Sequence, residues 1–269
     1  MKRRRQIEKL IVFILSILGF CLFPSSSRAQ DRAPGPVKYV FGRSVLGRPL
    51  LAYIFGSGHN VTMVFGGFHN NEPASSAVVE QLRAYLAGHP EEWSGRTVIV
   101  VPAVNPDSRS AGTRLNANGV DLNRNFPGTW QPVALAARYN PGPAAASEPE
   151  TQAVIRLVEE FAPAKIVSLH QPFHCLNWNG AKGRRLAEEM ALHNRYPVTG
   201  DIGYPTPGSF GAYAEQRGIA IVTLEMAVAG PAACWRKNRA ALLAAIRMEM
   251  ESPAPQVADN ATKPGPFPE

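Results

Sequence analysis

The sequence predicts a single α/β domain in which a mixed, mostly parallel twisted sheet is covered by helices on both faces. Short apolar runs alternate along the chain with helical patterns, which is typical of this class. Most of these runs are apolar nearly throughout, as expected for strands that are buried on both faces. Ligands of such sheets bind beyond the carboxyl ends of the strands, so polar side chains at those ends are candidates for a functional site.

The expected elements follow one another in a regular order. Strands are predicted at 50–55, 61–65, 97–103, 165–169 and 219–225, and helices at 74–88, 148–160, 181–194, 209–217 and 235–250. The second helix has a good start signal, because Ser147 is the expected N-cap and Glu150 follows three residues later. The stretch YVFGRSVLGRPLLAYIF predicts a hairpin that turns at Leu46-Gly47-Arg48, which makes the sheet mixed.

Residues 1–29 have the pattern of a secretory signal peptide. A basic start at 2–5 is followed by an apolar core at 10–23 and by small residues before a cleavage site after Ala29. The core is about 14 residues long, shorter than the roughly 20 that span a bilayer, so we expect cleavage, although retention as an anchor stays open. An exported, periplasmic protein without a stable membrane anchor after cleavage is therefore expected.

The net charge of +7 comes mostly from this leader, which holds six basic residues and one acid. The mature chain is left near +2, so no nucleic-acid partner is expected. One large domain is predicted at 30–251, and a disordered tail rich in Pro, Ala and Gly at 252–269. Cys175 and Cys234 are its two cysteines, and the sequence leaves open whether they form a disulfide or two separate buried thiols.

The stretch MVFGGFHNNEP places His69 and Glu72 directly after the strand 61–65. Catalytic zinc usually takes three protein ligands, and two histidines with one carboxylate suit this metal. His170 at the end of the strand 165–169 is the preferred third ligand, because a strand end is held more rigidly than the following loop, where His174 could compete. The His-x-x-Glu spacing alone is a weak signal that ordinary loops also show.

A second polar stretch, TRLNANGVDLNRNFPG at 113–128, has no steady period and is predicted to be an irregular loop. It concentrates Arg114, Asp121, Arg124 and four asparagines. Guanidinium groups bind carboxylates through paired hydrogen bonds, and asparagine amides add neutral donors, so the loop could hold a carboxylate and a developing oxyanion. A solvated surface loop is the alternative that composition alone favours.

These segments, together with Asn105-Pro106-Asp107 and the TLE that ends at Glu225, resemble in their order the zinc carboxypeptidases. LHQPFHCLNWNG and GYPTPGSFGAYA resemble the murein tripeptide amidase branch of that family. The resemblance covers about Gly42 to Cys234, and it implies a zinc carboxypeptidase-like fold for a zinc peptidase catalytic domain at 30–251. It also implies one Zn²⁺ per chain, bound by the residues at 69, 72 and 170.

The resemblance implies roles for the remaining candidates. Asp121 would orient His69 from behind the metal, which fixes a ligand imidazole in place. Asn70-Asn71 departs from the Gly-Asp pair that is common inside the first motif. The other implied roles are the general base for Glu225, polarisation of the scissile carbonyl for Arg114, and substrate binding for Asn123, Arg124 and Tyr204, where the spacing before Tyr204 differs by about one residue.

The implied activity is that of an exported zinc-dependent metallopeptidase which hydrolyses an amide bond next to a free carboxylate. The branch implies the bond between γ-D-glutamate and meso-diaminopimelate in peptidoglycan peptides, with a peptide or muropeptide as substrate. Alternatives are a general metallocarboxypeptidase that removes C-terminal residues and an inactive cell-envelope peptide-binding module. Phe210, which follows Ser209, is expected in the pocket wall that selects the substrate residue, where no acid favours a basic side chain.

Overall fold

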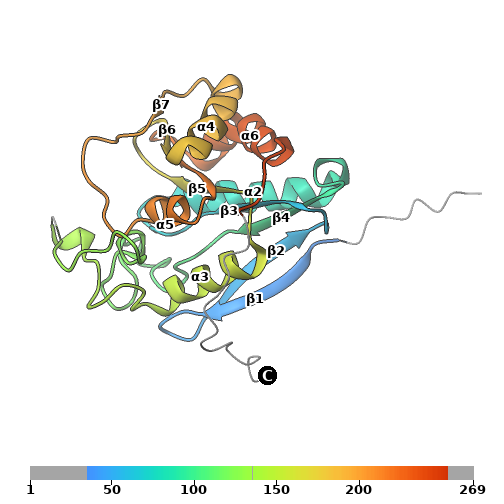
Figure 1. Cartoon of the computed structure of the whole chain (residues 1–269). Helices are drawn as coiled ribbons and strands as arrows, with labels where there is room; N and C mark the ends of the chain where they lie inside the picture. Colours follow the sequence, from blue (N-terminus) through green and yellow to red (C-terminus); the bar gives the residue numbers. More distant parts are fainter. Residues whose placement is uncertain (1–34, 135, 254–269) are drawn as a thin grey trace, which may run out of the picture. The chain divides into compact units, whose positions relative to one another are not determined.

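The computed structural model describes residues 35–134 and 136–253, so the expected leader and nearly all of the expected tail lie outside the described residues. The described part is built on one eight-stranded sheet with the strand order β1-β2-β4-β3-β5-β8-β6-β7 (Figure 1). Its strands are β1 Val37–Arg43, β2 Pro49–Phe55, β3 Asn60–Phe65, β4 Arg96–Val101, β5 Lys165–His170, β6 Cys175–Asn179, β7 Val198–Thr199 and β8 Ala220–Glu225.

The centre of the sheet is parallel and its flanks are mixed, as predicted. Strands β4, β3, β5 and β8 run parallel to one another, and β2 and β6 pair antiparallel with β4 and β8. The predicted hairpin joins β1 to β2. Gly47 in its turn has a φ of +76°, a backbone conformation that is strained for residues with a side chain. Strand β6 was not predicted, because the two asparagines in CLNWN interrupt the apolar pattern, and β7 was not predicted because it has only two residues.

Helices cover both faces of the sheet (Figure 1). They are α2 Pro73–Gly88, α3 Pro149–Phe161, α4 Gly180–Asn194, α5 Phe210–Gln216 and α6 Pro231–Arg247, with 3-10 turns η1 Pro90–Glu92, η2 Leu122–Arg124 and η3 Ala137–Tyr139. One apolar core joins α2, α4 and α6 to the sheet, and a second joins α3 and α5 to the opposite face. Within the described residues, none of these helices is long and apolar enough to cross a membrane.

Successive side chains of the central strands enter opposite cores, which confirms that these strands are buried on both faces. Val64 packs into the core beneath α2, whereas its neighbours Met63 and Phe65 pack into the core beneath α3 and α5. All three are fully buried, and burial of each such side chain stabilises the fold by roughly 1.5–3 kcal/mol. The sheet is therefore a rigid base for whatever lies at its strand ends.

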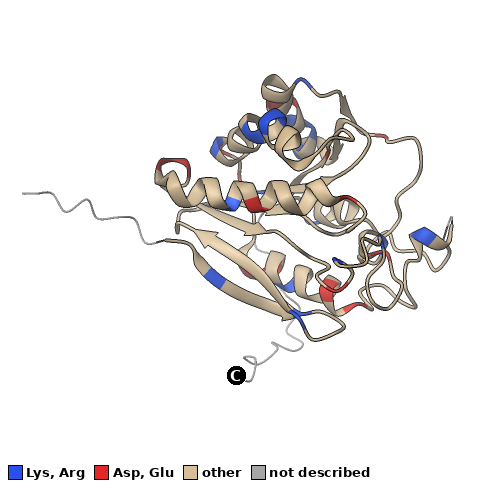
Figure 2. Cartoon of the chain, turned by 180° about the vertical axis from the view of Figure 1, so that it is seen from behind, with Lys and Arg blue, Asp and Glu red and all other residues tan. Residues whose placement is uncertain are grey.

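Some helix boundaries differ from prediction. The N-cap of α3 is Glu148 rather than Ser147, whose hydroxyl instead donates to the Glu148 carboxylate (2.8 Å). Helix α6 begins at Pro231, four residues earlier than expected, because proline is well tolerated at the first position of a helix. Helix α2 carries one acidic and one basic residue (Figure 2), and Arg83 donates to Glu80 at 2.7 Å.

Candidate metal centre and active site

A tight turn at Gly66-Gly67 carries the chain from β3 to His69. Gly66 lies so close to α2 that an added Cβ would meet the Ser75 carbonyl at 2.7 Å, and Gly67 has a φ of +67°. The Ser75 hydroxyl accepts a hydrogen bond from the Gly67 amide and donates one to the Glu72 carbonyl. Strand end, turn and helix start are thus held together, and the side chains of His69 and Glu72 are brought to one side.

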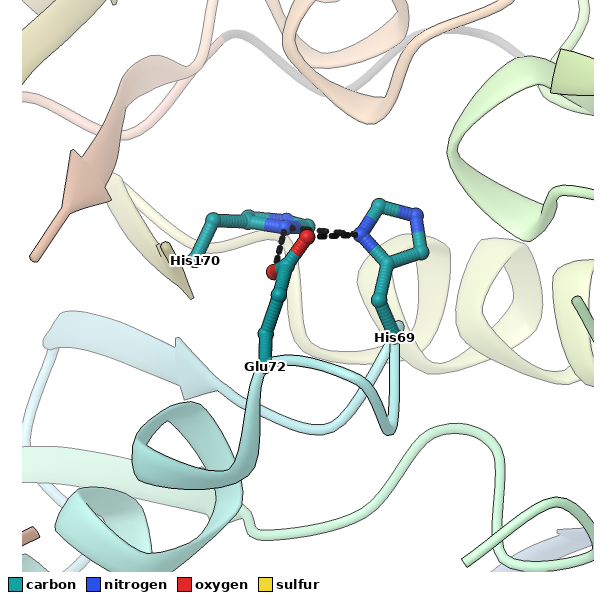
Figure 3. Close-up of side chains that lie close together, drawn as sticks. All are labelled: His69, Glu72 and His170. Carbon is teal, nitrogen blue, oxygen red and sulfur yellow. Dashed lines mark hydrogen bonds and ion pairs between the residues drawn. The ribbon is translucent and has the colours of Figure 1, made fainter. Parts of the chain in front are cut away.

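Three predicted ligands meet beyond the ends of β3 and β5 (Figure 3). One ligand atom of each of His69, Glu72 and His170 lies within 4.8 Å of the others, and all three residues are buried. The Nδ1 atoms of the two histidines are 3.2 Å apart. The Glu72 carboxylate approaches both rings, at 2.8 Å from His69 Nδ1 and 2.9 Å from His170 Nδ1.

This donor set fits a divalent cation. Two zinc–nitrogen bonds of about 2.1 Å at a tetrahedral angle span roughly 3.4 Å, close to the observed separation of the two imidazole nitrogens. Burial raises the pKa of Glu72, but the two neighbouring imidazoles outweigh it and hold that pKa well below its usual range. The carboxylate is therefore ionised at neutral pH, as a metal ligand must be.

Asp121 contacts the side of the His69 ring that faces away from the other two ligands, and Arg114 contacts Asp121. His69 Nε2 donates to Asp121 Oδ1 (2.9 Å), which leaves Nδ1 to face the other two ligands. Arg114 donates through Nε to Asp121 Oδ2 (2.9 Å) and reaches Glu72 Oε1 at 3.3 Å. Burial lowers the pKa of His69, yet the charges of Glu72 and Asp121 outweigh it, so that pKa lies above its usual value.

His174, the competing candidate, lies outside this trio. It is exposed, and its ring packs edge-on against Tyr196 with the ring centres 4.2 Å apart.

Asn70, which departs from the common form of the motif, supports the loop instead of facing the metal trio. Its amide side chain donates to the Asn105 carbonyl (2.7 Å), and its backbone amide donates to Thr113 (3.0 Å). An asparagine at position 70 is thus compatible with the geometry of the three metal ligands.

Glu225 ends β8 beside His170, its partner in register on β5. Its Oε2 atom is buried and has no hydrogen-bond partner among the described residues. Burial raises the pKa of Glu225, and the nearby Glu72 charge adds to this, while His170 opposes it. A buried carboxyl with an unused oxygen next to a metal trio is suited to accept a proton from a substrate or water.

One cavity of about 670 Å³ connects these groups. All the predicted site residues line it except Asp121, which is buried beneath the metal trio. Arg124 Nη1 donates to the Asn123 carbonyl (2.6 Å), and Asn123 Oδ1 accepts from the Phe210 amide (2.9 Å). Tyr204 is half-buried at the rim, where its ring contacts those of Tyr139 and Phe173.

Phe210 does not line the cavity, contrary to expectation. Its side chain is buried in an aromatic cluster, with ring centres 5.1 Å from Phe65 and 4.9 Å from Phe126. The helix α5 turns this position toward the core beneath the sheet and presents its neighbours Ser209 and Gly211 to the cavity. The selective wall must therefore be formed by other residues.

One wall of the cavity is formed by polar residues that could select the substrate residue. Asn177 and Asn179 of β6 and Thr223 of β8 line the cavity, and Asn177 is the register partner of Thr223. Asn177 donates to the Thr199 carbonyl (3.2 Å). An added Cβ on Gly211 would lie 2.2 Å from Asn179 Oδ1, so only glycine leaves room for this amide. The wall carries hydrogen-bonding groups without a net charge.

The sequence reasoning missed several residues of the cavity. Arg138 and Tyr139 of η3 line it, and so do the two asparagines of β6. Asparagine is depleted in strands, so two of them at alternate positions of CLNWN were the available signal for a functional wall. The segment around Tyr139 has no pattern that separates it from an ordinary surface loop.

Comparison with known proteins agrees with this geometry. A model of the family described as zinc carboxypeptidase matches residues 27–253. Murein peptide amidase A of Escherichia coli K12 is 34% identical over 215 residues, which cover 74% of this chain and 84% of that protein. Murein peptide amidase A of Vibrio campbellii is 33% identical over 218 residues, with 76% and 84% covered.

Solved structures show the same fold. The murein-tripeptide amidase of Escherichia coli O157 matches with a TM-score of 0.66 at 29% identity, covering 82% of this chain and 96% of that one. Carboxypeptidase A from Helicoverpa armigera matches with a TM-score of 0.68 at 17% identity, covering 79% and 68%. The predicted zinc carboxypeptidase-like fold is thereby confirmed.

Proposed function

Since this chain belongs to the zinc carboxypeptidase family and has an intact His-Glu-His trio, it is a metallopeptidase, and we propose that it hydrolyses the γ-D-glutamyl–meso-diaminopimelate bond of peptidoglycan peptides. The observation that carries this proposal is the cavity itself. It combines the metal trio, the Glu225 carboxyl and Arg124 with an uncharged polar wall, and Arg124 forms no ion pair with a carboxylate in the described part of the chain. The names of the matched amidases support the same substrate class.

The metal that fits best is zinc, held by His69, Glu72 and His170. A zinc ion bound there would supply an activated water and a polarised substrate carbonyl, as in other zinc peptidases. The Glu225 carboxylate accepts the proton of the attacking water and returns it to the leaving amine nitrogen. Arg114, held by Asp121, donates to the oxygen that becomes negative as the carbonyl carbon turns tetrahedral.

Arg124 and Asn123 orient the substrate. The Arg124 guanidinium offers a fork of donors for the carboxylate on the leaving residue, and its hydrogen bond to Asn123 holds it at the cavity wall. Binding of this carboxylate fixes the scissile amide relative to Glu225, so binding energy is used for orientation. In diaminopimelate that carboxylate is free, because the amide is made through the neighbouring amino group.

The polar wall supports a leaving residue with a polar side chain. Diaminopimelate ends in a group that has both an ammonium and a carboxylate. Carboxamides such as those of Asn177 and Asn179 have both an acceptor oxygen and donor hydrogens, so they can bind either charge. An apolar pocket would favour aliphatic residues, and a buried acid would favour lysine or arginine.

The substrate is tested with the mature chain and defined peptides. Purified residues 30–269 loaded with Zn²⁺ should release diaminopimelate from L-alanyl-γ-D-glutamyl-meso-diaminopimelate, and a chelator should abolish the release until Zn²⁺ is restored. The α-linked isomer of the same peptide is the matched control. Cleavage only of ordinary C-terminal residues would make the protein a general metallocarboxypeptidase. Tight peptide binding without cleavage by a metal-loaded sample would make it a binding module.

Export to the periplasm belongs to the same proposal, since peptidoglycan peptides are found there. The pattern of residues 1–29 supports it. Sequencing the amino terminus of the protein recovered from the periplasm should begin at Gln30. Recovery from the cytoplasm with an intact leader would overturn this part of the proposal and leave the activity untouched.

A further inference from the structure

Three guanidinium groups surround one aromatic ring in the cavity. The Cζ atoms of Arg114, Arg124 and Arg138 lie 5.1, 5.2 and 4.7 Å from the centre of the Tyr139 ring. A guanidinium over a tyrosine ring within about 6 Å is attracted to the negative face of the ring. Tyr139 therefore brings three positive charges together that would otherwise repel one another.

The position of Tyr139 is tied to the metal centre. The next residue, Asn140, accepts a hydrogen bond from the Asp121 amide (2.8 Å), and its side chain donates to the Gly119 carbonyl (2.8 Å). Asp121 in turn holds His69. The 3-10 turn η3, which carries Arg138 and Tyr139, is thus fastened to the same loop that orients the first metal ligand.

The charges around the ring are not balanced. Arg114 is paired with Asp121 and Glu72. Arg124 contacts the backbone carbonyl of Asn123, and Arg138 stacks on the ring. In residues 35–134 and 136–253, neither of these two guanidiniums forms an ion pair with a carboxylate, although both line the cavity and the charge of Arg124 acts on the buried Asp121 from a longer distance. The cavity thus has two guanidinium groups without an ion pair, each of which can donate hydrogen bonds to a pair of anionic oxygens.

We propose that Arg138, held on the face of Tyr139, binds a second carboxylate of the substrate, apart from the one beside the scissile amide that Arg124 binds. This inference rests on the proposed function and narrows it to substrates with more than one carboxylate near the bond. The γ-glutamyl tripeptide has two further candidates, the α-carboxylate of the glutamyl residue and the distal carboxylate of diaminopimelate. An ordinary peptide with a neutral penultimate residue has neither.

The test compares Arg138→Gln with wild type on three tripeptides. One is the native L-alanyl-γ-D-glutamyl-meso-diaminopimelate, and the others have the glutamyl α-carboxylate or the distal diaminopimelate carboxylate converted to an amide. On the native peptide, R138Q should raise KM about fivefold or more and change kcat little, because an exposed charge-assisted hydrogen bond is lost. On the analogue that lacks the bound carboxylate, wild type and R138Q should have equal KM, which identifies the carboxylate.

A matched control is Arg184→Gln, since Arg184 is exposed on α4 and pairs with Glu188 away from the cavity. R184Q should behave as wild type on all three peptides, and Arg138→Lys should recover part of the lost affinity. An unchanged KM in R138Q on the native peptide would overturn the inference. The same KM increase on all three peptides would also overturn it, because the effect would then be independent of the second carboxylate.

Failure of the proposed function is distinguishable from failure of this inference. If metal-loaded wild type releases no diaminopimelate, the proposed function is wrong. The subsite is then judged on ordinary acylated dipeptides that differ only in a penultimate glutamate or glutamine. Preference for glutamate that disappears in R138Q would support a second carboxylate site, and equal rates on both dipeptides in wild type would overturn it.

Discussion

His170 and Glu225 are register partners at the carboxyl ends of the parallel strands β5 and β8. The backbone amide after Glu225, that of Met226, donates to the His170 carbonyl at 2.8 Å. Neighbouring strands lie about 4.8 Å apart, so the sheet itself sets the separation between a metal ligand and the proposed base. Groups on paired strands are held more precisely than groups on loops, which favours a role for both in catalysis.

Replacing Glu225 with glutamine should abolish hydrolysis and leave the metal in place. The amide cannot accept the proton of water, so kcat should fall by about a hundredfold or more. Metal content measured beside the rate should equal that of wild type, because Glu225 is not one of the trio. Glu188→Gln, an exposed change on α4, is the control. Wild-type turnover by metal-loaded E225Q would refute the role of base.

Asp121→Asn should weaken metal binding. The negative charge behind His69 raises the basicity of that ligand, and loss of such a partner typically costs about tenfold to a hundredfold in metal affinity. Competition with a chromogenic chelator measures the change, with the exposed Glu188→Gln as control. If D121N holds zinc as tightly as wild type, Asp121 does not support the metal centre through His69.

Asn177→Leu should change substrate preference. The wall would lose hydrogen-bonding groups on the side of the cavity formed by β6, so KM for the diaminopimelate tripeptide should rise about tenfold or more. The kcat/KM for peptides with an apolar C-terminal residue should rise relative to that for the diaminopimelate tripeptide. Steady-state kinetics on the two substrates decides the matter. An unaltered ratio of kcat/KM values for the two would show that this wall does not select the leaving residue.

Lys165 should make folding stability depend on pH. It is fully buried at the start of β5, where its ammonium donates to Asn60 Oδ1 (2.7 Å) and to the Met248 carbonyl. Burial lowers the pKa of Lys165 to about 8, whereas the unfolded chain has the usual value of roughly 10.4. The unfolded state therefore binds more protons between these values, so the free energy of unfolding should rise with pH in that window.

The contribution is isolated by comparison with Lys165→Met. From pH 8 to about 10.4, the free energy of unfolding of wild type should gain up to about 3 kcal/mol relative to K165M, and below pH 8 the difference should stay constant. Denaturant titrations at several pH values measure it. The exposed Lys182→Met should follow wild type throughout. Parallel curves for K165M and wild type above pH 8 would contradict the lowered pKa.

Cys175 and Cys234 should be unreactive in the folded protein. Both are free thiols in the structure, and both are buried. Burial raises the pKa of Cys175 to about 11 and also raises that of Cys234, so little thiolate is present at pH 8. A thiol-specific chromogenic reagent should detect two thiols in the mature chain only after denaturation. A count of zero in the unfolded, unreduced protein would reveal a disulfide instead.

The metal trio was predictable because two of its members are three residues apart and the third ends a strand. His69 and Glu72 follow a strongly apolar run, and parallel neighbours in such sheets end at the same edge. His170 was therefore preferred over His174 on rigidity alone, and the structure brings only His170 to the other two. The central strands and both core faces were predictable for the same reason, since their apolar pattern is local.

Other parts of the site had no local signal. Asn177 belongs to a short strand whose polar residues hide its pairing with β8, and Tyr139 lies in a loop that resembles surface structure. The prediction for Phe210 was wrong because it rested only on the position of this residue directly after Ser209. In the structure, helix α5 directs the Phe210 side chain toward the buried aromatic cluster. Each of these outcomes depends on contacts between segments far apart in the chain.

By itself the sequence determined the order of the central strands and the helices, the ligand pair at one strand end and the family, because these depend on spacing and pattern within short segments. Only the tertiary structure decided which walls face the cavity and which charges around Tyr139 remain unpaired. The physical reason is that side-chain burial and ion pairing are set by neighbours across the sheet and across loops, and such neighbours do not follow from adjacency along the chain.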